Sequence, residues 1–210
     1  GGSVYRLNGS AWQPVGPNTS PFGSNGVVRL KTFDDGAGPR LYAGGNFPGA
    51  LAVWDGVAWT SPLGLGYYNF AEGGRVFEVF DDGAGACLYF ALLDGLRRWT
   101  GTTWEVVPGP YTSWVSDLLV HDDGTGPALF AARSDVNAAV VRYDGAAWTA
   151  ITPPGGVGSA SHLASYDDGG GPALFATAWF NLSNGAPAGG LAMWRAGRWT
   201  GFPSSMSGSG

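Results

Sequence analysis

The chain has 210 residues, of which 37 are Gly and 14 are Pro, while aromatic residues make up 14% and charged residues only 13%. This aromatic content excludes a disordered chain, the Gly residues lack the period of three of collagen, and no apolar run is long enough for a membrane-spanning helix. The formal net charge of −5 argues against a nucleic-acid partner, because phosphate groups select basic surfaces. The single cysteine, Cys87, excludes an intrachain disulfide.

The first part of the chain predicts a hairpin, followed by two strands around an acidic turn. Val4–Val15 predicts the hairpin. Val27–Phe33 alternates as a strand and stops at the turn cluster Asp-Asp-Gly-Ala-Gly-Pro of residues 34–39. Arg40–Phe47 then predicts the returning strand.

A second hairpin completes this first unit. Leu51–Trp54 and Val57–Thr60 predict its strands, and the Asp-Gly between them favours a two-residue turn. With that turn, the Trp54 and Trp59 side chains lie on one face, diagonal to each other. In the last unit the Gly stands one place later, in Trp194-Arg195-Ala196-Gly197, which predicts a three-residue turn.

Two motifs recur along the whole chain with a common period of about 45 residues, which is typical of a repeat array. The string Asp-Asp-Gly-x-Gly begins at Asp34, Asp81, Asp122 and Asp167. Two bulky residues five positions apart occur as the pairs Leu7 and Trp12, Trp54 and Trp59, Trp99 and Trp104, Tyr143 and Trp148, and Trp194 and Trp199.

These repeats predict an all-β fold of the β-propeller type. A four-stranded antiparallel unit of about 45 residues cannot bury both of its faces alone, whereas radial stacking of such blades does so, with the Trp pairs in the seams. We expect one domain over residues 4–203, between flexible or artificial tails at 1–3 and 204–210. Its units are a half-blade at 4–15 and complete blades at 27–61, 75–107, 115–151 and 160–202.

The number of hairpins does not decide whether the blades close into a ring. There are four inner hairpins, which carry the Asp-Asp-Gly loops, and five outer ones, so that the chain encodes four and a half blades. It closes as a five-bladed ring with one thin blade, or it is a piece of a longer or open array, or two chains complete each other through the unpaired half-blade. We favour the fragment or open assembly.

The motifs resemble two groups of propeller-like repeats. Tyr42-Ala43-Gly44-Gly45 followed by Trp54 and Trp59 is loosely similar to a kelch-type blade, although the other units lack the Gly pair. The combination of Asp-Asp-Gly-x-Gly-Pro with Trp-Asp-Gly-x-x-Trp resembles repeats of large secreted bacterial proteins. This resemblance implies a propeller fold and a bacterial protein that is extracellular or lies at the cell surface.

The aspartate pairs allow two interpretations. Closely spaced carboxylates on Gly-rich loops are typical of calcium ligands, but they also form tight turns by capping backbone N–H groups. We favour the turn role and expect no cofactor, with calcium as the alternative. The calcium hypothesis concerns Asp34, Asp35, Asp81, Asp82, Asp122, Asp123, Asp167 and Asp168.

The innermost strands of a propeller line its channel, and three of their residues form a candidate polar cluster: Arg29, Asp117 and His162. A general acid–base pair of His162 and Asp117 is the one enzyme-like feature, and a hydrogen-bonded lining is the commoner arrangement. We interpret His121 as a packing residue, because it replaces an aromatic residue of the other units. The sequence has no Ser/His/Asp spacing, His-x-x-x-His pair, phosphate loop or Cys cluster, and we expect no enzyme.

Aromatic residues in the long connections between blades are the candidate ligand-binding residues. They are Tyr67, Tyr68, Phe70, Tyr111, Trp114, Trp179 and Phe180, the last two in an apparent insertion of the last unit. Exposed rings beside Asn, Asp and Ser suit the apolar face of a sugar or a protein partner. The sequence therefore predicts a non-catalytic extracellular module that binds glycan or protein. The alternative is a structural repeat segment of a large secreted or filamentous assembly.

Overall fold

Antiparallel β-strands form every regular element of the described chain, which contains no helix. The computed structural model describes residues 4–16, 22, 26–61, 76–92, 95–110, 114–134, 138–151, 158–181 and 187–202. The tails at 1–3 and 204–210 lie outside these ranges. Within them, no helix is long and apolar enough to cross a bilayer.

The strands form one two-stranded hairpin and four four-stranded sheets, each in chain order. The hairpin consists of β1 (Tyr5–Asn8) and β2 (Ala11–Pro14). Blade 1 consists of β3 (Val27–Asp34), β4 (Pro39–Gly45), β5 (Leu51–Trp54) and β6 (Trp59–Thr60). Blade 2 consists of β7 (Phe77–Asp81), β8 (Ala86–Leu92), β9 (Gly95–Trp99) and β10 (Trp104–Val107).

The remaining strands belong to the last two sheets. Blade 3 consists of β11 (Val115–Asp122), β12 (Pro127–Arg133), β13 (Val140–Tyr143) and β14 (Trp148–Ala150). Blade 4 consists of β15 (Gly158–Asp167), β16 (Pro172–Asn181), β17 (Pro187–Arg195) and β18 (Arg198–Gly201). The prediction of an all-β protein made of propeller-like blades is confirmed.

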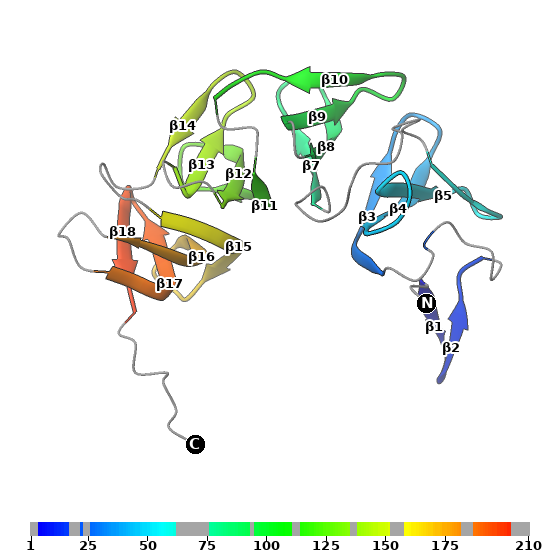
Figure 1. The fold of residues 1–210 in the computed structure, drawn as a ribbon, viewed down its shortest axis with the longest axis horizontal. Coiled ribbons are helices and arrows are strands. Elements are labelled where there is room, and N and C mark those ends of the chain that lie inside the picture. The colour runs from blue at the N-terminus through cyan, green and yellow to red at the C-terminus, as the bar shows by residue number, and fades with distance from the viewer. Residues whose placement is uncertain are drawn as a thin grey trace.

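The blades follow one another along an open arc (Figure 1). The innermost strands β3, β7, β11 and β15 contact one another in succession. The β1–β2 hairpin and blade 4 stand at the two ends of the arc, and no strand pairing between described residues joins them. The sheets therefore do not close into a ring, in agreement with the open arrangement that we favoured.

Bulky pairs from the outer strands fill the seams between neighbouring blades. The Trp99 and Trp104 rings lie 5.2 Å apart and pack with residues of blade 1, while Tyr143 and Trp148 pack with residues of blade 2. We call the side of a blade that meets the preceding blade its upstream face, and the opposite side its downstream face. The paired aromatic residues lie on the upstream faces.

Two outer turns differ in length from the prediction: one is longer and the other is shorter. Trp54 pairs directly with Trp59 rather than diagonally, across a four-residue loop. The Asp55 side chain causes this, because its Oδ1 accepts the N–H groups of Val57 and Ala58 at 2.8 and 2.7 Å. The predicted three-residue turn of the last unit is also wrong: Arg195 pairs with Arg198 across a two-residue turn, in which both residues have positive φ.

The strand order divides the loops between two edges of the arc. The Asp-Asp-Gly loops and the outer turns lie together, and we call this edge the aspartate rim. The connections between blades and the loops between second and third strands lie at the opposite edge, the connection rim. The assignment follows from the strictly antiparallel order within each blade.

Candidate functional site

Three of the innermost strands are interrupted at the same level by a register shift. The shifts lie between Val27 and Arg29, between Val115 and Asp117, and between Ala160 and His162. A β-bulge re-aims the side chain that follows it. The bulges thus place the three predicted polar residues at one level, near the connection rim.

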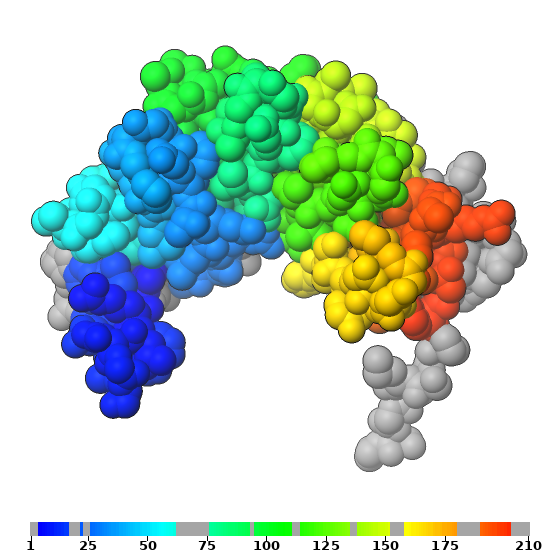
Figure 2. All heavy atoms as spheres, turned by 180° about the vertical axis from the view of Figure 1, so that it is seen from behind, coloured from blue at the N-terminus to red at the C-terminus, as the bar shows by residue number. Residues whose placement is uncertain are grey.

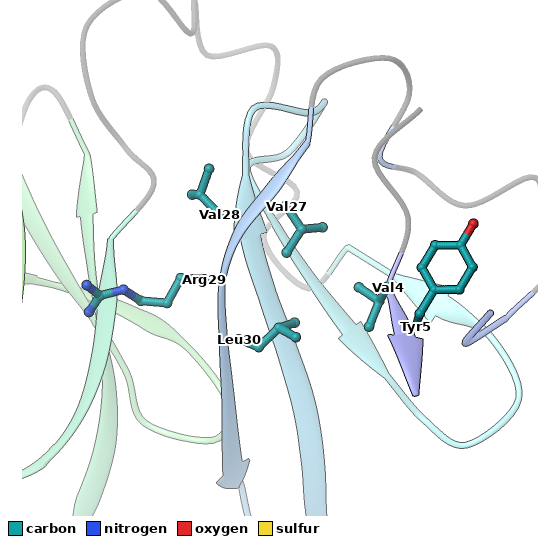
Figure 3. Close-up of a pocket in the computed structure, with 6 residues that line it drawn as sticks. All are labelled: Val4, Tyr5, Val27, Val28, Arg29 and Leu30. Carbon is teal, nitrogen blue, oxygen red and sulfur yellow. The ribbon is translucent and has the colours of Figure 1, made fainter. Parts of the chain in front are cut away.

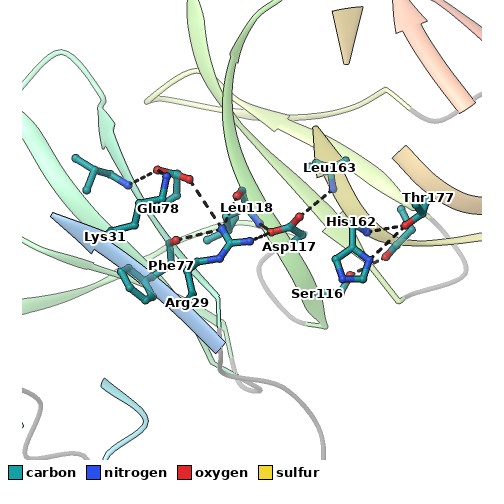
Figure 4. Close-up of polar contacts among 12 residues, drawn as sticks. Arg29, Lys31, Phe77, Glu78, Ser116, Asp117, Leu118, His162, Leu163 and Thr177 are labelled. Carbon is teal, nitrogen blue, oxygen red and sulfur yellow. Dashed lines mark hydrogen bonds and ion pairs between the residues drawn. The ribbon is translucent and has the colours of Figure 1, made fainter. Parts of the chain in front are cut away.

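Arg29 and Asp117 meet across the inner edge of the arc (Figure 4). Arg29 Nη2 donates to Asp117 Oδ1, and Arg29 Nη1 donates to the carbonyl oxygen of Leu118 at 3.0 Å. Asp117 Oδ2 accepts the backbone N–H of Leu163, in blade 4, at 2.9 Å. One buried carboxylate therefore ties blades 1, 3 and 4 together.

Glu78 joins blade 2 to the same network. Its Oε1 lies 2.7 Å from Lys31 Nζ, and its Oε2 lies 3.9 Å from Arg29 Nη1. Glu78 and Asp117 are both buried. Glu78 is not among the residues selected from the sequence. It occupies the Lys31 position of the next repeat, and opposite charges on adjacent inner strands are a signal that could have indicated an ion pair.

His162 takes no part in the Asp117 contacts described above. Its backbone N–H donates to Thr177 Oγ1 at 3.1 Å, and the ring Nδ1 lies 3.4 Å from the same oxygen. The side chain is exposed, and it is Leu163 that contacts Asp117. The three predicted residues therefore share a level, but the structure brings only Arg29 and Asp117 into contact.

His121 is a buried seam residue, as its alignment with aromatic residues suggested. Its Nδ1 lies 2.8 Å from Ser165 Oγ of blade 4, and its ring stands edge-on to Phe130. Burial lowers the pKa of His121, although the charges of Asp123 and Asp122 oppose this shift. The neutral imidazole thus acts as a packing group in this seam.

In every Asp-Asp-Gly loop, the first aspartate folds the turn. Its Oδ1 accepts two backbone N–H groups, and in blade 3 these are Gly124 at 2.9 Å and Gly126 at 3.0 Å from Asp122. Asp34, Asp81 and Asp167 make the equivalent pairs of hydrogen bonds. This geometry supports the turn interpretation of the motif.

The second aspartate of each loop caps one more N–H group and pairs with an arginine. Asp82 Oδ1 accepts the N–H of Ala84 at 3.1 Å, and its Oδ2 accepts hydrogen bonds from the Tyr89 hydroxyl and Arg98 Nη1. Burial alone would raise the pKa of Asp82, but these donors hold it below its usual value. Burial and the bond to Asp82 raise the pKa of Tyr89. The arginine partners in the other blades are Arg40, Arg142 and Arg195.

The calcium hypothesis concerns these same carboxylates. Within the described ranges, no group of three or more His, Cys, Asp or Glu side chains has the arrangement of a metal site. The Oδ1 atom of each first aspartate is engaged by two backbone N–H groups of the turn.

Only part of the predicted aromatic set falls on described residues. Trp114 is 50% exposed and has a positive φ of 59°. Trp179 is 73% exposed, but it lies on β16, opposite Ser159, and not in an insertion loop as predicted. The strand continues because β15 supplies pairing partners as far as Gly158. Phe180 is also on β16, and its side chain, like Tyr67, Tyr68, Phe70 and Tyr111, lies outside the described residues.

A cavity of about 330 Å³ lies between β1 and β3 (Figure 3). Val4, Tyr5, Val27, Val28, Arg29 and Leu30 line it. The half-blade consists of an outer hairpin alone, and in a complete blade two inner strands would stand here. Leu30 is 44% exposed, whereas Phe77, its counterpart in blade 2, is fully buried.

The fold and these contacts define an all-β repeat protein with propeller-like blades in an open arc. No protein-family model matches the chain, and a search of curated proteins finds no match.

Proposed function

We propose that the chain is a non-catalytic interaction module, extracellular or at the bacterial cell surface, that binds glycan through aromatic side chains of its connection rim. The placement of Trp114 is the observation that carries this proposal. A large amphipathic ring that stays half exposed offers a flat apolar surface with an N–H donor at its edge. Such a surface suits the apolar face of a pyranose ring.

The backbone of Trp114 supports a presenting role. A non-glycine residue in the left-handed region costs about 1 kcal/mol, and such residues concentrate at binding sites. The carbonyl oxygen of Trp114 accepts the N–H of Ser134 at 2.9 Å, which fixes the start of β11. Trp179 stands on the same rim in the next blade and supplies a second exposed indole.

A glycan-array screen, run once in calcium and once in chelator, tests the proposal. We expect saturable binding to one class of sugar, which falls at least tenfold in Trp114→Ala and is largely restored in Trp114→Phe. Val57→Ala is the control, because Val57 is an exposed apolar residue of an outer turn on the aspartate rim, at the opposite edge from Trp114. Loss of binding in chelator would favour calcium ligands among the aspartate pairs.

A blank array in both buffers would contradict the glycan proposal. If the same blank protein captures an extracellular protein, and Trp114→Ala abolishes that capture, the rim binds protein.

A structural repeat segment of a larger secreted or filamentous assembly is the second candidate. One observation favours it: both ends of the arc carry exposed apolar faces. This candidate needs no small ligand.

A further inference from the structure

The two ends of the arc expose the kinds of surface that meet inside every seam. Figure 2 shows the hairpin and blade 4 on either side of the opening. The hairpin presents an upstream face, and blade 4 presents a downstream face. In blades 1 to 3, the corresponding faces are covered by a neighbouring blade.

The upstream face of the hairpin carries Tyr5, Leu7 and Trp12. Leu7 pairs directly with Trp12, at the positions that Trp54 and Trp59 hold in blade 1. Trp12 is 67% exposed, whereas Trp59 is buried in the seam. The hairpin thus carries a bulky pair of the usual kind that no preceding blade covers.

The downstream face of blade 4 carries Tyr166, Phe175 and Phe202. The Phe175 ring lies 6.3 Å from Tyr166 and 6.1 Å from Phe202. Tyr166 is 63% exposed, whereas Phe80, its counterpart in blade 2, is 3% exposed. Met193 occupies the position that Arg98 and Arg142 hold in blades 2 and 3, so that the centre of this face is uncharged.

The seam between blades 2 and 3 shows how such faces fit. Tyr143 belongs to the upstream face of blade 3. Its ring centroid lies 6.4 Å from that of Phe80 and 6.2 Å from that of Tyr89, both on the downstream face of blade 2. At the aspartate rim, the outer turn of blade 3 touches the loop of blade 2: a Cβ added to Gly145 would lie 2.6 Å from the Asp82 carbonyl oxygen. By position in the repeat, Leu7 corresponds to Tyr143, and Tyr166 and Phe175 correspond to Phe80 and Tyr89.

From this correspondence we infer that the downstream face of blade 4 binds the β1–β2 hairpin of a second copy of this chain, head to tail. Tyr166 and Phe175 of one copy receive Leu7 and Trp12 of the next, in the manner of an internal seam. The Asp167–Asp168 loop then lies beside the Asn8–Gly9 turn of the second copy. Because the contact joins two different surfaces, it continues from copy to copy until the assembly closes on itself.

The residues that form the contact are apolar, which distinguishes it from a charged interface. Its stability comes from burying rings, so that added salt does not weaken the association. The inference does not rest on Trp114, the residue that carries the proposed glycan site, because Trp114 belongs to neither end face. Trp179 lies on the same face of β16 as Phe175, at the edge of the downstream face, so that only Trp114 separates the two proposals.

Sedimentation velocity from micromolar to submillimolar concentration tests the inference. We expect the wild-type mass to rise with concentration to twice the monomer mass and beyond, at low and at high salt. Trp12→Asp and Tyr166→Asp should each sediment at the monomer mass, because each lacks one of the two faces. An equimolar mixture of the two variants should give a species of twice the monomer mass and nothing larger, since each supplies the face that the other lacks.

Val57→Asp is the control variant, because Val57 is an exposed apolar residue of an outer turn outside both end faces, and it should associate as the wild type does. Circular dichroism confirms that every variant is folded. Three results would overturn the inference: a wild type that stays monomeric throughout the range, a monomer whose own two end faces cross-link to each other, or a mixture of the variants that remains monomeric.

Discussion

The guanidinium of Arg29 donates to the carboxylate of Asp117, a residue two blades further along the chain. The same carboxylate also accepts the backbone N–H groups of Leu118 and Leu163 at 2.9 Å each. Loss of this one side chain would therefore remove an acceptor from three donors at the inner edge of the arc.

Asp117→Ala should lower the free energy of unfolding by about 2–4 kcal/mol, because removal of the carboxylate leaves its hydrogen-bond donors without this acceptor in a buried site. Asp117→Asn keeps an oxygen acceptor and should cost less. Urea denaturation measures both values. Arg6→Ala, on the exposed hairpin, is the control and should change stability by less than about 0.5 kcal/mol. Equal stability of Asp117→Ala and the wild type would show that the network contributes nothing.

Two glycines at the same position of the repeat allow the cost of backbone strain to be measured separately from the cost of a tight seam contact. Gly56 and Gly145 have φ values of 102° and 100°, but a Cβ at Gly56 meets open space, whereas one at Gly145 meets the Asp82 backbone. Gly56→Ala should cost about 1 kcal/mol from φ alone. Gly145→Ala should cost about 1–3 kcal/mol more, as in overpacked sites, and thermal or urea unfolding measures the difference. Equal costs would contradict the tight seam.

His121 should make the fold sensitive to mildly acidic pH. Its pKa is lowered in the fold by burial, so that below the ordinary value of about 6.5 the unfolded chain binds a proton that the folded chain does not. The free energy of unfolding should therefore fall as the pH falls below about 6.5. His121→Phe, which copies Phe33 and Phe80, should flatten this dependence.

Phe80→His is the reciprocal variant, because Phe80 is the equivalent buried residue in blade 2. It should steepen the loss of stability at acidic pH. If the pH dependence of the free energy of unfolding is unchanged in both variants, the residue at this seam position does not determine that dependence.

The aspartate loops should behave as turns when they are tested for metal. Asp122→Ala removes the acceptor of two N–H groups and should cost about 1–2 kcal/mol, and Asp122→Asn should cost less because an oxygen remains. The thermal midpoint of the wild type should be the same in calcium and in chelator. A midpoint that rises in calcium, and no longer does so in Asp122→Ala, would establish calcium binding instead.

Local sequence was enough to define the blades. The period of about 45 residues, the Asp-Asp-Gly loops and the bulky pairs are short-range patterns, because a turn and its flanking strands lie within a few residues of one another. The outer turns were predicted less well. The Asp-Gly of the Trp54 loop favours a two-residue turn. The Asp55 carboxylate, however, accepts two successive N–H groups and so stabilises a four-residue loop.

The sequence by itself therefore determined the strand pattern, the seam aromatics and the acidic turns. Only the tertiary structure decided that Arg29 contacts Asp117 while His162 turns to Thr177, since this depends on how neighbouring blades are inclined and on bulges that re-aim single side chains. It also decided that the arc stays open, which leaves Trp12 and Tyr166 exposed. Closure depends on the sum of the small rotations between blades, and no short stretch of sequence specifies that sum.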